Sequence, residues 1–168
     1  QINEKTGIIT RAKFLDREKI PFYSLTCVAV ANSAYGKIRV NVTITDVNDN
    51  RPVFPKEKDE IRVEENAPVG QEIYHARARD KDVGVNSRIK YSLSVNPEDL
   101  FRINEATGAI HLNRKIYQDP GTTIQLEVTA SDFSDPSMFS KQFLAVTILD
   151  VNDHTPVFDH TSYETSLL

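Results

Sequence analysis

Carboxylate and amide side chains gather in a few short motifs of this 168-residue chain. The motif DVNDN occupies residues 46–50 and DVNDH occupies residues 150–154, and in both cases one residue separates the motif from Pro-Val-Phe. More acidic residues stand in LDRE (15–18), RDKDVGVN (79–86) and TASD (129–132). Hard oxygen atoms in such number are the ligands that Ca²⁺ requires, because this ion takes six to eight of them at once. The motifs therefore indicate calcium binding.

Seven carboxylates belong to the motifs that surround residues 46–50: Asp16, Glu18, Asp46, Asp49, Asp80, Asp82 and Asp132. Two like charges about 5 Å apart repel by roughly 3 kcal/mol at an effective dielectric of about 20, so these groups either stand apart or hold cations. A single DVNDN could equally be an Asx-rich turn. An EF-hand loop does not fit, because Gly84 and Tyr91 stand where that loop needs Asp or Asn and then Glu.

The chain contains an internal repeat. INEKTGII at Ile2 recurs as INEATGAI at Ile103, an offset of 101 residues, and the DVND motif at Asp46 recurs at Asp150, an offset of 104. Such a period fits a whole small domain better than a solenoid unit of about 20 to 50 residues. We therefore predict that residues 1–50 are the C-terminal half of a repeat plus its linker, that 51–154 are a complete repeat plus its linker, and that 155–168 are the first strand of a following repeat. The regions around 46–50 and 150–154 are called the first and second joints.

Apolar and polar residues alternate with the period of two that is typical of strands. Leu25, Cys27 and Ala29 share one face of such a strand, and Cys27 is expected there as a buried small hydrophobic residue rather than a reactive thiol. In the complete repeat the pattern predicts strands over 60–64, 71–79, 88–94, 100–103, 108–112, 123–131 and 139–149. About seven antiparallel strands in about 100 residues predict an all-β, immunoglobulin-like sandwich, and an odd strand count places its two ends at opposite poles, so that repeats line up into a rod.

Composition excludes several classes of protein. The net charge is −4, and the densest basic stretch, 77–81, already contains Asp80, so nucleic acid is not an expected partner. The single cysteine can form neither an internal disulfide nor a four-ligand zinc site. The longest uncharged apolar run, 143–149, is too short to cross a membrane, so any membrane anchor is expected outside this segment. No catalytic signature is present, so we expect neither an enzyme nor a small-molecule substrate.

Taken together, LDRE, DVNDN followed by PVF, VEENAPVG (63–70) and DKDVGVN followed by IKYSL (89–93) resemble the extracellular repeats of cadherins over essentially the whole chain. The resemblance implies seven-stranded Greek-key sandwiches in tandem, three calcium ions in each full linker, and a role in cell adhesion or recognition. It also implies a location on the extracellular face of the plasma membrane and other cadherin ectodomains as homophilic or heterophilic partners. A calcium-stiffened spacer, with adhesive contacts made elsewhere in a larger ectodomain, is the alternative.

The resemblance also assigns calcium ligands at the first joint. Asp16 and Glu18 match the acidic pair that binds the first two ions, and the linker ligands of those ions correspond to Asp46, the Val47 carbonyl and Asp49. The residues that match the set for the third ion are Asn48, Asn50 through its carbonyl, Asp80, Asp82, Asn86 through its carbonyl, and Asp132, with Asp82 shared between two ions.

The second joint departs from this pattern. Its matching residues are Glu65, Asp119, Asp150, Asn152 and Asp153. Tyr117 stands where the pattern has Asp, and Asp119, one methylene shorter, stands where it has Glu, so we expect weaker calcium binding there. Tryptophan is absent, which argues against the strand-swap adhesion of classical cadherin tips and favours interior repeats.

Asn41-Val42-Thr43 is an N-glycosylation sequon. The alternation of the predicted strand places Asn41 on its polar side, between the inward-facing Val40 and Val42. We therefore expect Asn41 to be exposed and open to glycosylation.

Overall fold

A computed structural model describes residues 1–153, 155–160, 162 and 164–166 of the chain. The strands are β1 (Phe22–Ala31), β2 (Ala34–Thr43), β3 (Lys58–Glu64), β4 (Glu72–His75), β5 (Ile89–Val95), β6 (Phe101–Ile103), β7 (Ala109–Leu112), β8 (Thr123–Asp132) and β9 (Phe139–Leu149). Two short 3-10 helices, η1 (Gly84–Ser87) and η2 (Pro97–Asp99), complete the regular structure. The prediction of an all-β protein is confirmed.

Seven strands, β3 to β9, form the sandwich of the complete repeat. One sheet has the order β3-β9-β8-β5 and the other β4-β7-β6. Every pairing is antiparallel except β3 with β9, which is parallel over Lys58–Glu64. Leu126, Val128, Leu144 and Val146 alternate inward from β8 and β9 and are at most 1% exposed. The period-two pattern of the sequence therefore selects the residues of the core.

The repeat is visible in the hydrogen bonds of its first motif. Asn3 Oδ1 accepts hydrogen bonds from the amides of Lys5 and Thr6, both at 3.0 Å. Asn104 Oδ1 accepts the equivalent pair from Ala106 and Thr107, also at 3.0 Å. The same sequence therefore folds into the same Asx turn twice.

Gly108, which closes the second of these turns, allows a close approach of two backbone segments. Its φ is +78°, and a Cβ atom built there would lie 2.3 Å from the carbonyl oxygen of Ala76. Gly108 O accepts the amide of Ala76 at 3.0 Å. A side chain at position 108 would both strain the backbone and break the contact between this turn and the segment that follows β4.

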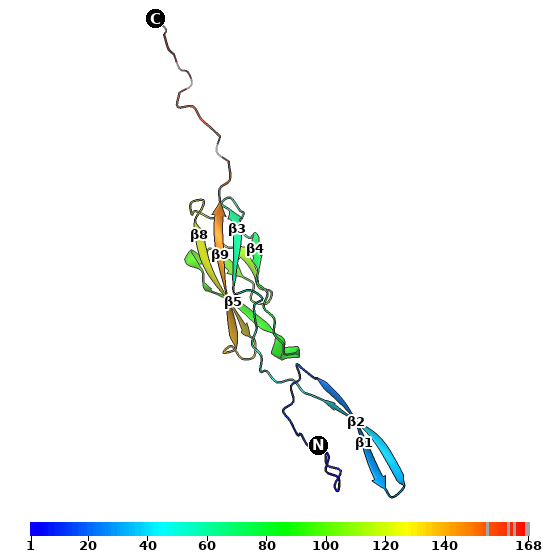
Figure 1. Cartoon of the computed structure of the whole chain (residues 1–168). Coiled ribbons are helices and arrows are strands. Elements are labelled where there is room, and N and C mark those ends of the chain that lie inside the picture. The colour runs from blue at the N-terminus through cyan, green and yellow to red at the C-terminus, as the bar shows by residue number, and fades with distance from the viewer. Residues whose placement is uncertain (154, 161, 163, 167–168) are drawn as a thin grey trace.

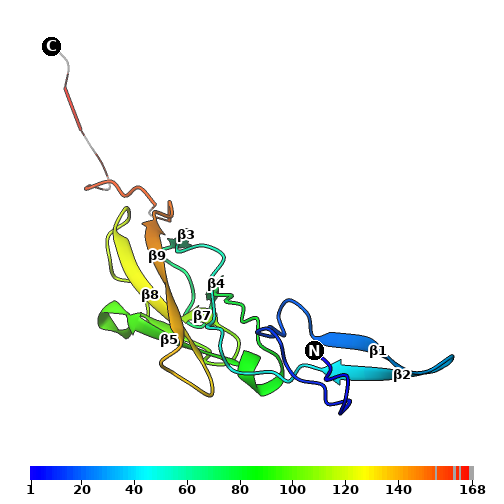
Figure 2. The same ribbon diagram turned by 60° about the horizontal axis from the view of Figure 1, so that its bottom comes forward.

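Strands β1 and β2 form a hairpin that extends away from the sandwich (Figures 1 and 2). Leu25 pairs with Val40 and Cys27 with Ile38, so the apolar residues share one face as predicted. Asn41 lies exposed between the half-buried Val40 and Val42, as the strand register requires, and its Oδ1 accepts a hydrogen bond from Ser24 Oγ at 3.0 Å. Cys27 is only half-buried, contrary to expectation, because no second sheet covers the apolar face of this hairpin.

Two further expectations about strands differ from the structure. The strand predicted over 71–79 ends at His75. Beyond it the chain leaves the sheet edge, Ala78 N–H donates to the Tyr91 hydroxyl at 3.0 Å, and Arg79 forms an isolated bridge with Val53. The described residues of 155–168 contain no strand, because no other strand in the described chain hydrogen-bonds with them. Their assignment to a following repeat stays a prediction, and residues 154, 161, 163, 167 and 168 lie outside the described part.

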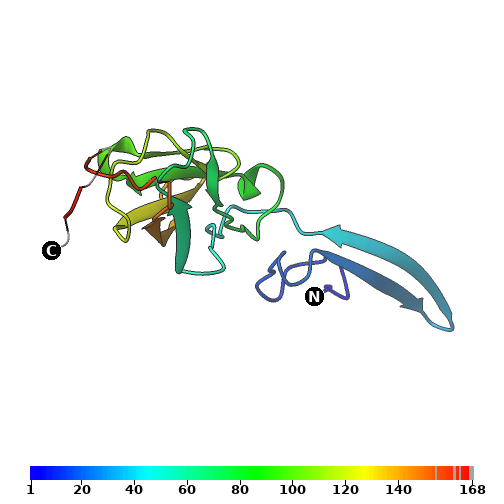
Figure 3. The same cartoon turned by 90° about the horizontal axis from the view of Figure 1, so that it is seen from above.

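The parts of the chain follow one another along an elongated shape. The hairpin lies at one end, the sandwich in the middle, and the segment after β9 leaves the far end, an order that the view from above also shows (Figures 1 and 3). Among the described residues no helix is long and apolar enough to cross a membrane.

The distribution of the core predicts which part of the chain folds alone. All residues of the buried hydrophobic cluster lie between Phe54 and Ile148. A polypeptide of residues 51–154 should therefore unfold in one cooperative thermal transition, whereas residues 1–50 should show none, since their hairpin buries too little apolar surface to offset the entropy of ordering. Circular dichroism melting of the two peptides measures this, and a sharp transition in residues 1–50 would contradict the prediction.

Candidate metal centre

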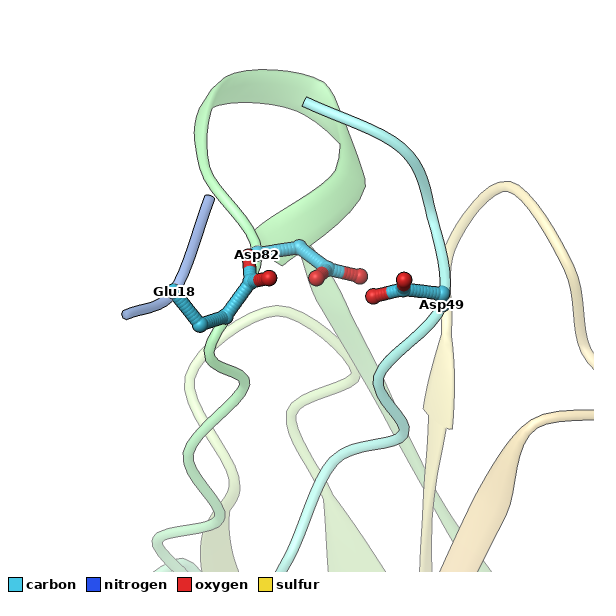
Figure 4. A group of neighbouring side chains, drawn as sticks. All are labelled: Glu18, Asp49 and Asp82. Atoms are coloured by element: carbon cyan, nitrogen blue, oxygen red, sulfur yellow. The ribbon is translucent and has the colours of Figure 1, made fainter. Parts of the chain in front are cut away.

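Three carboxylates from three separate segments meet at the first joint. Glu18 belongs to the loop before β1, Asp49 to the linker, and Asp82 to the turn that precedes η1. One oxygen from each lies within 4.8 Å of the others, and Figure 4 shows the three side chains directed toward one another. At this separation each pair repels by about 3 kcal/mol at an effective dielectric of about 20. The arrangement therefore favours a bound cation.

The linker is held to the complete repeat by its own amide groups. Asn50 donates two hydrogen bonds to the buried Asp82 carboxylate, from its backbone N–H at 3.1 Å and from its side-chain amide at 2.6 Å. Asn48 Nδ2 donates to Asp132 Oδ1 at 2.9 Å. The linker thus reaches two carboxylates that the sandwich itself places at this end of the repeat.

The turn after β8 positions Asp132, which is 1% exposed. Its Oδ1 accepts the amides of Ser134 and Asp135, at 2.8 and 2.6 Å, in addition to the amide of Asn48. In the first repeat the loop between β1 and β2 is only Asn32 and Ser33, and Ala31 stands at the matching position. The loop between β8 and β9 is longer, and its amides at Ser134 and Asp135 orient Asp132 inward.

Apart from Asp46 Oδ1, which pairs with Arg17, three buried oxygens at the joint have no hydrogen-bond donor in the described chain: Asn48 Oδ1, Asp80 Oδ2 and Asp132 Oδ2. Each of these residues makes a hydrogen bond to protein through another side-chain atom. Asn48 Nδ2 donates to Asp132 Oδ1, and Asp80 Oδ1 accepts the Asp82 amide at 2.9 Å. Buried acceptors without donors are uncommon in proteins. Oxygen atoms of this kind fit a hard cation such as Ca²⁺, and all three belong to the set that the sequence assigned to the third ion.

Electrostatic strain is concentrated at Asp80. Burial raises the pKa of its carboxyl above the ordinary value, and the nearby charges of Asp82 and Asp132 raise it further, against a hydrogen bond from the Asp82 amide. Folding therefore disfavours the charged form of Asp80. This penalty is absent below the pKa of the unfolded chain and is fully present above the pKa of the folded chain, so it acts at neutral pH.

Asp46 occupies the other side of the joint and is better compensated. Its Oδ2 accepts the Val83 amide at 3.2 Å and the Asn86 amide at 3.0 Å, and its Oδ1 forms an ion pair with Arg17. Burial opposes ionisation of Asp46, but these three contacts together lower its pKa. Asp46 therefore remains a carboxylate at neutral pH and ties the linker to η1.

Arg17 is a cation within the site that the sequence analysis did not single out. Its guanidinium forms ion pairs with both Glu18 and Asp46 and donates to the Lys81 carbonyl at 2.8 Å, so it bridges the two repeats. The only sequence signal was its place between Asp16 and Glu18 in LDRE. Any calcium ion bound to Glu18 and Asp46 must compete with this side chain for their oxygens.

Asp16 is not part of the cluster. One of its oxygens accepts the Lys19 amide at 3.1 Å and the other pairs with Lys19 Nζ at 2.7 Å. The hydrogen bonds to Lys19 lower the pKa of Asp16, although burial opposes them. Val47 is exposed in the linker. The structure therefore brings together Glu18, Asp46, Asn48, Asp49, Asn50, Asp80, Asp82, Asn86 and Asp132. Asp16 lines the same hollow as Glu18 and Asp49 but is paired with Lys19.

The second joint is more open. Glu65 Oε1 accepts the Val151 amide at 3.0 Å, and Glu65, Asp119 and Asp153 line a shallow depression of about 290 Å³. Asp150 and Asn152 follow β9 at exposed positions. Tyr117, at the position where the first joint has Asp16, is 83% exposed. The residues described there do not include a group of three mutually close carboxylates such as that at the first joint.

A seven-stranded sandwich that follows a β-hairpin and a linker rich in inward carboxylates has the architecture of the extracellular tandem-repeat proteins of the cadherin class. Residues 59–149, more than half of the chain, match the family described as Cadherin domain. The chain therefore belongs to the cadherin family, as the sequence motifs implied. Its repeats are extracellular, like the solved extracellular cadherin domains of Protocadherin Gamma B2 that they resemble, with 31% identity and a TM-score of 0.74 over 84% of this chain and 28% of that chain.

Similar proteins are long. Protocadherin Fat 4 of Homo sapiens is 43% identical over 166 residues, which cover 99% of this chain and 3% of that protein. Protocadherin-15 of Homo sapiens is 37% identical over 96% of this chain and 8% of its own length. The structure of mouse cadherin-23 EC22-24 superposes with a TM-score of 0.79 and 30% identity over 89% of this chain and 49% of that one. The chain thus spans a small fraction of the curated relatives it matches.

The strain at Asp80 yields a prediction with two opposite signs. Asp80→Asn keeps the oxygen that accepts the Asp82 amide but removes a charge, so in EDTA at pH 7 it should raise the thermal midpoint by about 4 °C, on the order of 1 kcal/mol. The same change should reduce the rise in midpoint that added calcium produces. Differential scanning calorimetry with and without calcium tests both effects. Asp135→Asn is the control and should not raise the midpoint, because hydrogen bonds from Ser137 lower the pKa of Asp135.

Proposed function

We propose that this part of the chain is a calcium-dependent adhesion or recognition module, in which Ca²⁺ at the first joint locks the two repeats into a fixed orientation. The observation that carries the proposal is the group of Glu18, Asp49 and Asp82, whose carboxylate oxygens lie within 4.8 Å of one another although they come from the first repeat, the linker and the complete repeat. A cation held by all three would cross-link these segments.

The ligands of the ions follow from the atoms that protein contacts leave available. Asn48 Oδ1, Asp80 Oδ2 and Asp132 Oδ2 have no donor among the described residues and would face one ion, with Asp82 shared between this ion and a neighbouring one. Glu18, Asp46 and Asp49, with the Val47 carbonyl, would hold the others once Arg17 moves aside. Asp16 would join them by exchanging Lys19 for calcium.

The ions would act by neutralisation. Without a cation the carboxylates repel one another, and the described residues connect the two sides of the joint through hydrogen bonds and the Arg17 ion pairs. With calcium, the same carboxylates attract a common centre, and the linker dihedrals become fixed. A rigid array of repeats can present an adhesive surface to another cadherin ectodomain at a set distance.

The function of a spacer is the second candidate, and the elongated order of the parts favours it (Figure 1). In that case the repeats set distance or transmit force while contacts are made elsewhere. Sedimentation of the chain in calcium distinguishes the two: weak self-association supports an adhesive surface, and a strictly monomeric rod supports the spacer. Glycosylation at the exposed Asn41 is compatible with either.

Chelation tests the mechanism in a polypeptide that begins one half-repeat upstream, so that both repeats are complete. We expect calcium to bind with a dissociation constant of roughly 10⁻⁴ to 10⁻³ M or somewhat tighter, the range of extracellular modules. EDTA should let the joint flex, which broadens the distribution of interatomic distances from small-angle scattering and exposes the first joint to proteases. Asp82→Ala should abolish most of the calcium effect, whereas Glu57→Ala, an exposed carboxylate on the approach to β3, should not change it. Identical scattering and protease resistance with and without calcium would overturn the mechanism.

The two joints should differ in affinity. Tyr117 removes one carboxylate from the second joint and Asp119 reaches less far than glutamate, so calcium that saturates the first joint should only partly fill the second, leaving a bend or hinge after residue 154. Calcium titration of a chain extended through the following repeat measures both joints. Tyr117→Asp with Asp119→Glu should tighten the second joint alone. Equal affinities in the wild type would show instead that water and ligands of the following repeat supply what is missing.

A further inference from the structure

Four cations share one outer face of the complete repeat beside the first joint. Val53 and Arg79 pair through two backbone hydrogen bonds of 2.8 and 2.9 Å, so their side chains lie on the same side. By alternation, Arg51 lies on the same side of its segment as Val53, and Arg77 and Lys81 lie on the same side as Arg79. Burial agrees, because these residues are exposed while the residues between them on the 51–55 segment, Pro52 and Phe54, are buried.

This basic face, defined as Arg51, Arg77, Arg79 and Lys81, surrounds a hollow. The hollow has a volume of about 1220 Å³, and its other walls include Val53, Met138 and Phe139. None of the four cationic groups forms an ion pair with a described residue of the chain. Sequence alone suggested that Asp80 breaks up the stretch 77–81, but the pairing of Val53 with Arg79 adds Arg51 to the basic residues of this stretch, while Asp80, whose Oδ2 is buried, lines the same hollow.

We propose that this hollow binds a sulfated polysaccharide, and that calcium at the first joint strengthens the binding. The first part rests on the basic face alone, and the second rests also on the proposed calcium function.

The chemistry of the walls favours a sulfated sugar. Arginine guanidinium groups present several N–H donors in a planar fork that matches tetrahedral oxyanions such as sulfate. Val53 and Phe139, which are 53% and 42% exposed, offer apolar surface between the cations for the C–H faces of sugar rings. The whole chain carries a net charge of −4, so attraction of a polyanion must come from this local face. Basic clusters of this kind bind heparin-like polyanions in other proteins, and this repeat is extracellular.

The calcium dependence follows from two residues that the hollow shares with the metal centre. Asp49 and Asp80 line the same hollow as the four cations. Without a metal ion the negative charges of these two carboxylates offset part of the positive potential of the hollow that they line together with the cations. Calcium bound to these carboxylates would remove that offset and leave the basic face unopposed.

The test measures binding of the full chain to a heparin-derived octasaccharide by isothermal titration calorimetry, in 2 mM calcium and in EDTA, at about 0.15 M NaCl. We expect binding in calcium that is at least threefold weaker in EDTA. Arg77→Gln with Arg79→Gln should weaken it at least tenfold. Arg102→Gln with Arg114→Gln is the control and should change it less than twofold, because these exposed arginines lie toward the second joint, where the neighbouring Lys115 lines a different depression.

Other outcomes separate the inference from the calcium mechanism. Calcium affinity and thermal stability of each variant are measured in parallel. A loss of octasaccharide binding supports the inference when the variant keeps the calcium affinity and the thermal midpoint of the wild type. No octasaccharide binding in a chain that binds calcium would overturn this inference and leave the proposed function intact. Octasaccharide binding that is identical in calcium and EDTA would refute the coupling alone. Equal binding of fully desulfated heparin or of polyglutamate would refute recognition of sulfated sugar.

Discussion

Repulsion among inward-facing carboxylates is the constraint on which the first joint depends. The sandwich needs its end turns to be closed by Asx hydrogen bonds, and Asp80 and Asp132 supply them with one oxygen each. Their second oxygens are then buried without donors. Stable packing of the β core therefore places negative charge at the pole of the repeat, and the linker reaches that pole with amides from Asn48 and Asn50 but also with further carboxylates. The joint is held by neutral donors and by the ion pairs of Arg17, and it is opposed by repulsion among its carboxylates, which a divalent cation would relieve.

The same geometry separates the roles of the two repeats. The complete repeat contributes buried, pre-oriented groups such as Asp82 and Asp132, whose positions follow from β8 and the turn before η1. The preceding half-repeat contributes Glu18 from a loop, and its arginine neighbour already provides a counter-charge. In the proposed calcium site, the complete repeat would supply the buried ligands and the loop before β1 would supply an exposed one. Under the proposed function, calcium would control the orientation of the joint, while the core of the complete repeat lies apart from it, between Phe54 and Ile148.

Much of this architecture could be predicted from sequence because it rests on local signals. The strands follow period-two alternation, and the Asx turns follow a repeated Asn-x-x-Thr-Gly spacing at Asn3 and Asn104. The choice of partner among charged groups could not be predicted in the same way. Asp16 pairs with Lys19 and Arg17 with Asp46 because several oppositely charged groups lie within reach and small differences in geometry decide between them. The end of β4 at His75 and the basic face likewise depend on the bridge between Val53 and Arg79, which joins segments 26 residues apart.

The parallel pairing of β3 with β9 determines how the complete repeat would carry tension. β3 begins near the first joint and β9 ends near the second, and they run in the same direction, side by side from Lys58 to Glu64. A pull applied through the two linkers therefore draws the strands lengthwise past each other and loads all of their hydrogen bonds together in shear. Antiparallel strands pulled from the same end would instead peel apart one bond at a time. The joints would then yield to tension before the sandwiches unfold. Ions bound at the joints would set the force at which they yield.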